Sequence, residues 1–193
     1  MNAREEWTLV ENMTMGVFVL DYNENHDPKN GQFASKGYID VTKDYYSDAT
    51  PGQGFINYDE GYNKAVHVDE IAFAKWLHGT LGGNIQLVKE ANMDKVLSPD
   101  FIWDGRAWEL KTPTTAAAAD SALRKGIKQV DGSGGIILNY PDKSIPLAKI
   151  MNVVVSRFKR TSLDCYIDVM IIQGGNISKI IHKIGRASCR ERV

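Results

Sequence analysis

Apolar side chains recur at helical spacing in residues 68–81. The Gly82-Gly83 pair follows directly, and the apolar positions are Ile71, Phe73, Ala74, Trp76 and Leu77. Apolar residues at intervals of three and four form one face of a helix, and paired glycines end a helix in the expected way. The pattern therefore predicts a helix from Val68 to Leu81 with one buried face.

Short apolar runs and further helical segments follow this helix. Strands are predicted at Ile85–Val88, Phe101–Trp103 and Arg106–Lys111. Asp104-Gly105 joins the last two as a hairpin, because both central positions of a type I′ turn need positive φ. The pattern then predicts a helix, a strand, a helix and two strands: Thr115–Val130, Gly135–Tyr140, Ile145–Phe158, Cys165–Ile172 and Ile177–Ile181. This order predicts an α/β fold with a mixed β-sheet flanked by helices.

The two ends of the chain differ from this organised part. Residues 1–59 are rich in Asn, Asp, Gly, Tyr and Ser, and are expected to be a polar lead-in or linker with one short strand or hairpin arm at Met15–Leu20. The last ten residues, Ile184–Val193, resemble the translation of a sequencing-adapter read-through. We therefore expect one domain at residues 60–183 and a non-native tail, with a genuine basic tail as the alternative.

The overall charge does not indicate a polyanion-binding protein. The 193-residue chain has a formal charge of −1, and the tail contributes +2, which leaves −3 for the remainder. No signal-peptide pattern or bilayer-length apolar run is present, so a cytoplasmic protein without a membrane partner is expected. Cys165 and Cys189 match neither a disulfide framework nor a zinc-ligand spacing. The oligomeric state is left open by these features.

The predicted hairpin brings acidic and basic side chains together. With a two-residue turn at Asp104-Gly105, Asp100 is expected opposite Glu109, and the two-residue period of a strand brings Lys111 to the same face. Directly opposed carboxylates repel each other, so this arrangement calls for a compensating cation. Phe101 and Trp108, the next pair, are expected to face the core from the opposite side. The competing interpretation is an exposed hairpin with ordinary solvated charges.

A divalent metal suits this predicted arrangement. Mg²⁺ prefers oxygen ligands and is commonly held by one or two carboxylates together with substrate phosphate oxygens. Mg²⁺ is therefore the expected cofactor, with Mn²⁺ and Zn²⁺ as alternatives. Such a metal promotes phosphodiester hydrolysis, and a neighbouring ammonium, here Lys111, positions water or neutralises charge in the transition state.

Further candidate residues lie on the two predicted helices around the hairpin. Glu70 falls on the apolar face of residues 68–81 and is a candidate third metal ligand, or alternatively a helix-start carboxylate at an exposed edge. His67 precedes it and is a candidate substrate contact, or a structural histidine. The candidate nucleic-acid-binding residues on the second helix are Arg124, Lys125, Lys128 and Gln129, although a charged helix face is more often simply solvated.

Ser98-Pro99-Asp100, the following eight residues and Glu109-Leu110-Lys111 resemble the PD-(D/E)xK motif of nucleases. The wider pattern comprises His67 to Ala72, Trp76-Leu77, the segment SPDFIWDGRAWELK and Ile127-Lys128-Gln129 before an apolar strand. It is similar to the CdiA C-terminal tRNA nuclease type of toxin domain, which is also fused to phage minor head proteins and other polymorphic toxins. The resemblance covers about residues 37–183 and extends to the αβββαβ order of the core.

The resemblance implies metal-dependent cleavage of nucleic acid, with tRNA as the favoured substrate and a cognate immunity protein as partner. It implies a catalytic set of Glu70, Asp100, Glu109 and Lys111, with Gln129 as a weaker member. Relatives tend to carry an acidic residue where this chain has Asn139, so the role of that position is open. Two alternatives remain: a DNA endonuclease of the same fold, acting in restriction, repair or phage recombination, and a non-catalytic nucleic-acid-binding module.

Overall fold

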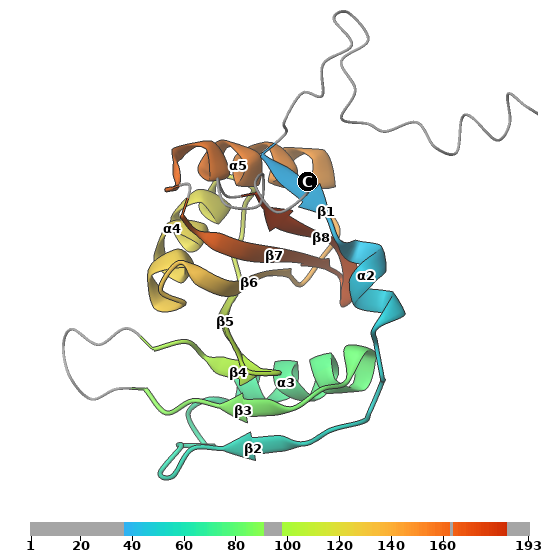
Figure 1. The fold of residues 1–193 in the computed structure, drawn as a ribbon, viewed down its shortest axis with the longest axis vertical. Coiled ribbons are helices and arrows are strands. Elements are labelled where there is room, and N and C mark those ends of the chain that lie inside the picture. Colours follow the sequence, from blue (N-terminus) through green and yellow to red (C-terminus); the bar gives the residue numbers. More distant parts are fainter. Residues whose placement is uncertain (1–36, 91–97, 163, 185–193) are drawn as a thin grey trace, which may run out of the picture. The chain divides into compact units, whose positions relative to one another are not determined.

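One mixed β-sheet of eight strands organises the residues that the computed structural model describes, 37–90, 98–162 and 164–184 (Figure 1). The strand order across the sheet is β1-β8-β7-β6-β5-β4-β3-β2. The β2/β3, β5/β6 and β6/β7 pairs are parallel, and the other neighbours are antiparallel. The strands are β1 Tyr38–Asp40, β2 Ile56–Tyr58, β3 Ile85–Leu87, β4 Phe101–Trp103, β5 Arg106–Lys111, β6 Ser133–Tyr140, β7 Tyr166–Gln173 and β8 Asn176–Lys183. The predicted α/β class is confirmed.

Among the described residues, four helices cover the two faces of this sheet: α2 Thr42–Ser47, α3 Val68–Leu81, α4 Ala118–Gln129 and α5 Leu147–Arg160. Side chains of α2 and α3 pack in one apolar cluster with Phe101, Trp103 and Trp108. Side chains of α4 and α5 pack in a second cluster with alternate residues of β6, Ile136 and Leu138. A strand buried on both faces reads as a continuous apolar run, which explains the predicted strand at Gly135–Tyr140.

The predicted elements match the observed ones with small changes at their ends. The helix Val68–Leu81 and the strands Phe101–Trp103 and Arg106–Lys111 are confirmed with the predicted bounds. Helix α4 begins at Ala118 and not at Thr115. The Thr115 side-chain oxygen accepts the Ala118 N–H in the manner of an N-cap, and the N–H groups of Ala119 and Asp120 first make tighter bonds to the carbonyls three residues before them. The Asp104-Gly105 turn is confirmed, with φ of 45° and 78°.

The organised part of the chain begins earlier than residue 60. Strand β1 pairs with β8 at one edge of the sheet, and β2 pairs with β3 at the other. Residues 38–58 therefore form a strap that supplies both edge strands, with α2 between them. This corrects the predicted linker, because polar composition also suits short edge strands that are exposed to water on one side. The predicted strand at Met15–Leu20 and the tail from residue 185 lie outside the described residues.

Candidate acidic site at the fork between β4 and β5

The hairpin register is confirmed for three pairs and ends there. Phe101 pairs with Trp108, as predicted, and the pairs toward the turn follow the same register. From Trp108 onward, β5 pairs in parallel with β6 on its other side. Asp100 lies at a bend before β4 and donates its N–H to the Trp108 carbonyl at 3.1 Å. The expected fourth ladder pair between Asp100 and Glu109 is absent, because the two strands separate and form a fork.

The carboxylate of Asp100 occupies the opening of this fork. Its Oδ2 accepts the main-chain N–H of Leu110 at 2.6 Å. Leu110 lies between Glu109 and Lys111 on β5, on the side that β4 no longer covers. The side chain of Asp100 therefore satisfies a donor that a neighbouring strand would otherwise bind.

Glu109 is a fully buried carboxylate beside the same fork. Glu109 is 0% exposed. Its Oε1 accepts a hydrogen bond from the ammonium of Lys111, two residues further along the strand. Its Oε2 is buried and makes no hydrogen bond of normal geometry with any residue that the structure describes. The side chain of Gln129, at the end of α4, approaches this carboxylate and helps Lys111 to lower its pKa. Trp108 is buried on the opposite face, as predicted.

The electrostatics show that the acidic groups share one environment. Burial and, next, the charge of Glu109 raise the pKa of Asp100 to about 7, and the charge of Glu70 adds to this rise. Burial raises the pKa of Glu109 above its usual value although the Lys111 ammonium opposes the effect. A carboxylate whose pKa is raised by burial and by neighbouring carboxylates favours a nearby cation. One ammonium partly compensates this cluster.

Glu70 reaches the site from α3 and is held by two neighbours. Tyr62 donates its hydroxyl to Glu70 Oε2 at 2.9 Å, and Nδ1 of His67 lies 2.9 Å from Oε1. The rings of Tyr62 and His67 also pack together, with centroids 5.1 Å apart. His67, a predicted substrate contact, is therefore engaged in orienting Glu70, which is the structural alternative considered for it.

The donor set fits a metal that completes its coordination with other oxygens. Glu109 Oε2 is a buried acceptor without a normal hydrogen bond, and the adjacent Asp100 carboxylate has a raised pKa. Within residues 37–90, 98–162 and 164–184, no three acidic, His or Cys side chains form a complete metal-binding group. Two carboxylates plus substrate phosphate oxygens and water are the arrangement that Mg²⁺ commonly takes.

A groove with a volume of about 410 Å³ lies on the α3 face next to this site. Leu110 and Thr112 of the β5 end line it, together with Trp76 of α3 and Asn139 near the end of β6. Asn139, whose role was left open, therefore lines a groove and does not join the carboxylates. The lining is mostly apolar with a few polar groups, among them Asp69, which is the usual composition of a ligand-binding groove.

The candidate nucleic-acid-binding residues of α4 divide between two positions. Arg124, Lys125 and Lys128 are exposed on the side of the helix away from the sheet. Gln129 is half-buried and turns toward Glu109. Helix α4 therefore contributes to the carboxylate site through one residue and to the surface through the other three.

Comparisons with known proteins leave the family of this chain unassigned. No family model, curated protein or solved structure matches it. Among the described residues, no helix is both long and apolar enough to cross a membrane.

A second buried polar cluster was missed in the sequence. Asp168 on β7 is 3% exposed and accepts the Tyr45 hydroxyl at 2.5 Å and the Arg106 guanidinium at 2.6 Å. Nδ1 of His182 lies 2.6 Å from its other oxygen. These residues border a cavity with a volume of about 380 Å³ beneath α2. Because all three partners come from different elements, the cluster ties α2, β5 and β8 to β7.

One sequence signal for this cluster existed. Asp168 is the single charged residue in the apolar run Cys165–Ile172, and a buried carboxylate needs partners. Its cross-strand neighbour His182 was hidden because the β7–β8 register shifts between Ile171 and Ile172. A bulge of this kind changes which residues face each other and leaves no clear mark in the pattern.

Proposed function

We propose that this protein is a metal-dependent nuclease, and specifically a toxin-type tRNA endonuclease. The observation that carries the proposal is the pair formed by the half-buried Asp100 and the fully buried Glu109 at a strand fork, with Lys111 hydrogen-bonded to Glu109. Burying like charges costs stability, and such an arrangement is favoured at sites that bind a cation. The resemblance of SPD and ELK to the PD-(D/E)xK motif supports the same reaction.

Asp100 and Glu109 would hold the divalent metal, Mg²⁺ in our proposal, with Mn²⁺ and Zn²⁺ as alternatives. A bound metal of this kind supplies Lewis acidity to the phosphoryl group and lowers the pKa of a coordinated water. Glu70 is oriented by Tyr62 and His67 and adds negative charge next to Asp100, as a third ligand or through water.

Lys111 has two roles in this proposal. Its ammonium keeps Glu109 from being an uncompensated buried charge, and its side chain is 24% exposed, so it also borders solvent. A cation at this point stabilises the extra negative charge that develops on the phosphate as the bond to the leaving oxygen breaks. Gln129 orients Glu109 from the side of α4.

The groove beside the site favours RNA with unstacked bases over a continuous duplex. Trp76 offers an aromatic surface, and sequence-specific RNA recognition relies on bases stacked against such side chains.

A DNA endonuclease of the same fold remains the second candidate, because the hydrolytic chemistry is the same. A non-catalytic nucleic-acid-binding module is the third. The resemblance also suggests contact-dependent growth inhibition, with a cognate immunity protein as partner and the target cytosol as the place of action.

The deciding experiment incubates the full chain with total tRNA and with duplex DNA, in Mg²⁺ or in EDTA. We expect tRNA cleavage in Mg²⁺ only, and its loss in Glu109→Gln and Lys111→Ala. Lys75→Ala, on the exposed side of α3, is the matched control and keeps full activity. Cleavage of DNA alone would select the second candidate. Binding of nucleic acid without cleavage in any metal would select the non-catalytic binding module and refute the proposed enzymatic activity.

A further inference from the structure

Positive charge is concentrated on the helix layer formed by α4 and α5. These two helices carry seven Lys or Arg residues and a single acidic residue, Asp120. Helices α2 and α3, which cover the other face of the sheet, carry two basic and three acidic residues. The near-neutral charge of the whole chain, −1, therefore hides a strong difference in charge between the two pairs of helices.

The basic side chains of this layer point away from the core. The buried positions of α4 and α5 are apolar, for example Leu123 and Val154. The exposed basic residues are Arg124, Lys125, Lys128, Lys149, Lys159 and Arg160. Within the part of the chain that the structure describes, only Arg160 of these six has an ion pair. The remaining five present their full charge to solvent.

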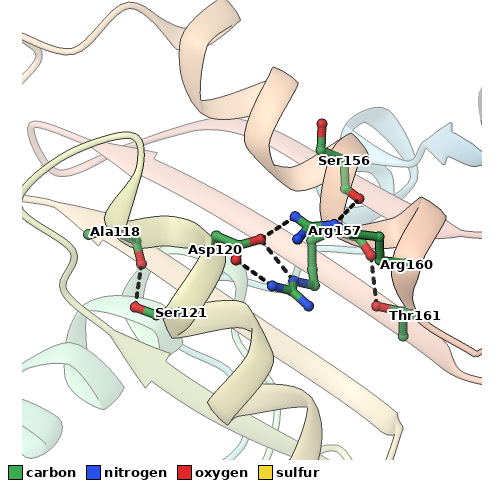
Figure 2. A network of polar contacts seen from close by, with 7 residues as sticks. All are labelled: Ala118, Asp120, Ser121, Ser156, Arg157, Arg160 and Thr161. Atoms are coloured by element: carbon green, nitrogen blue, oxygen red, sulfur yellow. Dashed lines mark hydrogen bonds and ion pairs between the residues drawn. The ribbon is translucent and has the colours of Figure 1, made fainter.

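Asp120 does not neutralise the layer but fixes two of its arginines (Figure 2). Its carboxylate accepts Arg157 through both oxygens, and Arg160 Nη2 donates to Oδ1 at 2.6 Å. Arg160 Nε donates in addition to the Ser156 carbonyl at 3.1 Å. The side chain of Arg160 is 55% exposed, so a pre-oriented guanidinium faces solvent beside the junction of the helices.

We propose that the outer surface of α4 and α5 binds the phosphodiester backbone of the nucleic-acid substrate. This inference rests on the proposed function and assigns its substrate-binding surface. Helix α4 connects the carboxylate site with the basic surface, because it places Gln129 at the Glu109 carboxylate and three basic side chains on its outer side. Backbone contacts by Lys and Arg supply affinity and position without reading sequence. The α5 residues Lys149, Lys159 and Arg160 extend the surface beyond the α4 positions that the sequence indicated.

The test measures binding of fluorescein-labelled tRNA to the full chain in EDTA over a range of salt concentrations. Lys149→Ala/Lys159→Ala removes two charges from the proposed surface. Lys43→Ala/Lys75→Ala removes two exposed charges from α2 and α3 and is the matched control. The slope of log affinity against log salt should fall by roughly 1.4 to 1.8 in the first variant, since each lost phosphate contact contributes about 0.7 to 0.9. The control should keep the slope of the unmodified chain.

Each outcome separates this inference from the nuclease proposal. An equal loss of tRNA affinity in both variants would show an effect of total charge and would refute the proposed binding surface. Unchanged affinity in both variants, or no tRNA binding by the unmodified chain, would refute it as well. Metal-dependent cleavage by the unmodified chain, together with an unchanged salt dependence of binding in Lys149→Ala/Lys159→Ala, would support the nuclease proposal and refute the binding surface. tRNA binding that depends on these lysines, with no tRNA cleavage in Mg²⁺, would support the binding surface and refute the nuclease proposal. Circular dichroism confirms that both variants are folded.

Discussion

The carboxylate of Asp100 accepts the main-chain N–H of Leu110 at 2.6 Å, at the point where β5 has left β4. One side chain therefore has a structural and a chemical role. As a hydrogen-bond acceptor it satisfies a donor at the fork, and as a half-buried charge near Glu109 it is costly to keep ionised. The two roles can be separated by substitution.

Asp100→Asn should retain the fold and lose nuclease activity. The amide oxygen of Asn can still accept the Leu110 N–H, while the change removes a half-buried charge that the neighbouring carboxylates oppose. We expect unfolding at or above the temperature of the unmodified chain. Asp100→Ala leaves the donor unsatisfied and should lose about 1 to 3 kcal/mol of stability. Thermal unfolding and tRNA cleavage distinguish the variants, and equal destabilisation by both would contradict the role of the hydrogen bond.

Lys111→Ala should destabilise the protein through Glu109. The buried carboxylate would lose its ammonium partner, a change that typically costs about 3 to 5 kcal/mol for a buried pair, and somewhat less here because Lys111 is 24% exposed. Adding Glu109→Gln removes the uncompensated charge and should restore most of the stability but none of the activity. Urea unfolding of the single and double variants checks this. A double variant no more stable than Lys111→Ala would refute the coupling.

Asp168 should make stability depend on pH in the acid range. Burial alone raises the pKa of this carboxyl, but hydrogen bonds from His182 and Tyr45 and the Arg106 charge outweigh burial and hold it below the ordinary value of 3.8. A carboxylate with a depressed folded pKa stabilises above the unfolded pKa and loses this contribution as pH falls through the folded one. Asp168→Asn should therefore be less stable than the unmodified chain at about pH 6, with the gap narrowing at about pH 3. A constant gap in urea unfolding would contradict the assignment.

Gly135→Ala should disturb the wall behind the candidate site. A Cβ at this position would lie 2.1 Å from Cε3 of Trp108, so the buried indole must move. Such overpacking typically costs about 1 to 3 kcal/mol. Gly79→Ala is the matched control, because a Cβ there meets nothing within 4 Å. Gly79 lies in the last turn of α3, where alanine should stabilise by at most about 0.5 to 1 kcal/mol. Near-UV circular dichroism reports the indole, and thermal unfolding reports the stability.

The sequence predicted the individual helices and strands better than the pairing between distant strands. Helix α3 and the β4–β5 hairpin followed from apolar spacing and from the Asp104-Gly105 turn, which are local signals. The strap of residues 38–58 was missed because three-residue edge strands have too few positions for a period to show. Their pairing with β8 and β3 depends on contacts distant in sequence.

The candidate site was predicted in its members and not in its geometry. Asp100, Glu109 and Lys111 lie together around the fork, but Asp100 is bonded to the Leu110 backbone and does not pair across from Glu109. The β4 ladder ends at Phe101 while β5 continues along β6 on its other edge, and no local pattern indicates where that ladder ends. The charge of α4 and α5 was likewise concealed by the near-neutral total, because every acidic residue except Asp120 lies outside these two helices in the sequence.

The pairing of β1 with β8 also constrains how the protein is made. The Ile180 N–H donates to the Thr42 side chain at 2.8 Å, across 138 residues of sequence. As the ribosome releases the chain, β1 emerges early and has no sheet partner until β8, Asn176–Lys183, has been translated. A ribosome that stalls before this point leaves the apolar strand β7 as an open sheet edge, which is a template for aggregation. Translation through β8 is therefore the step that allows β8 and β1 to cover the β7 edge.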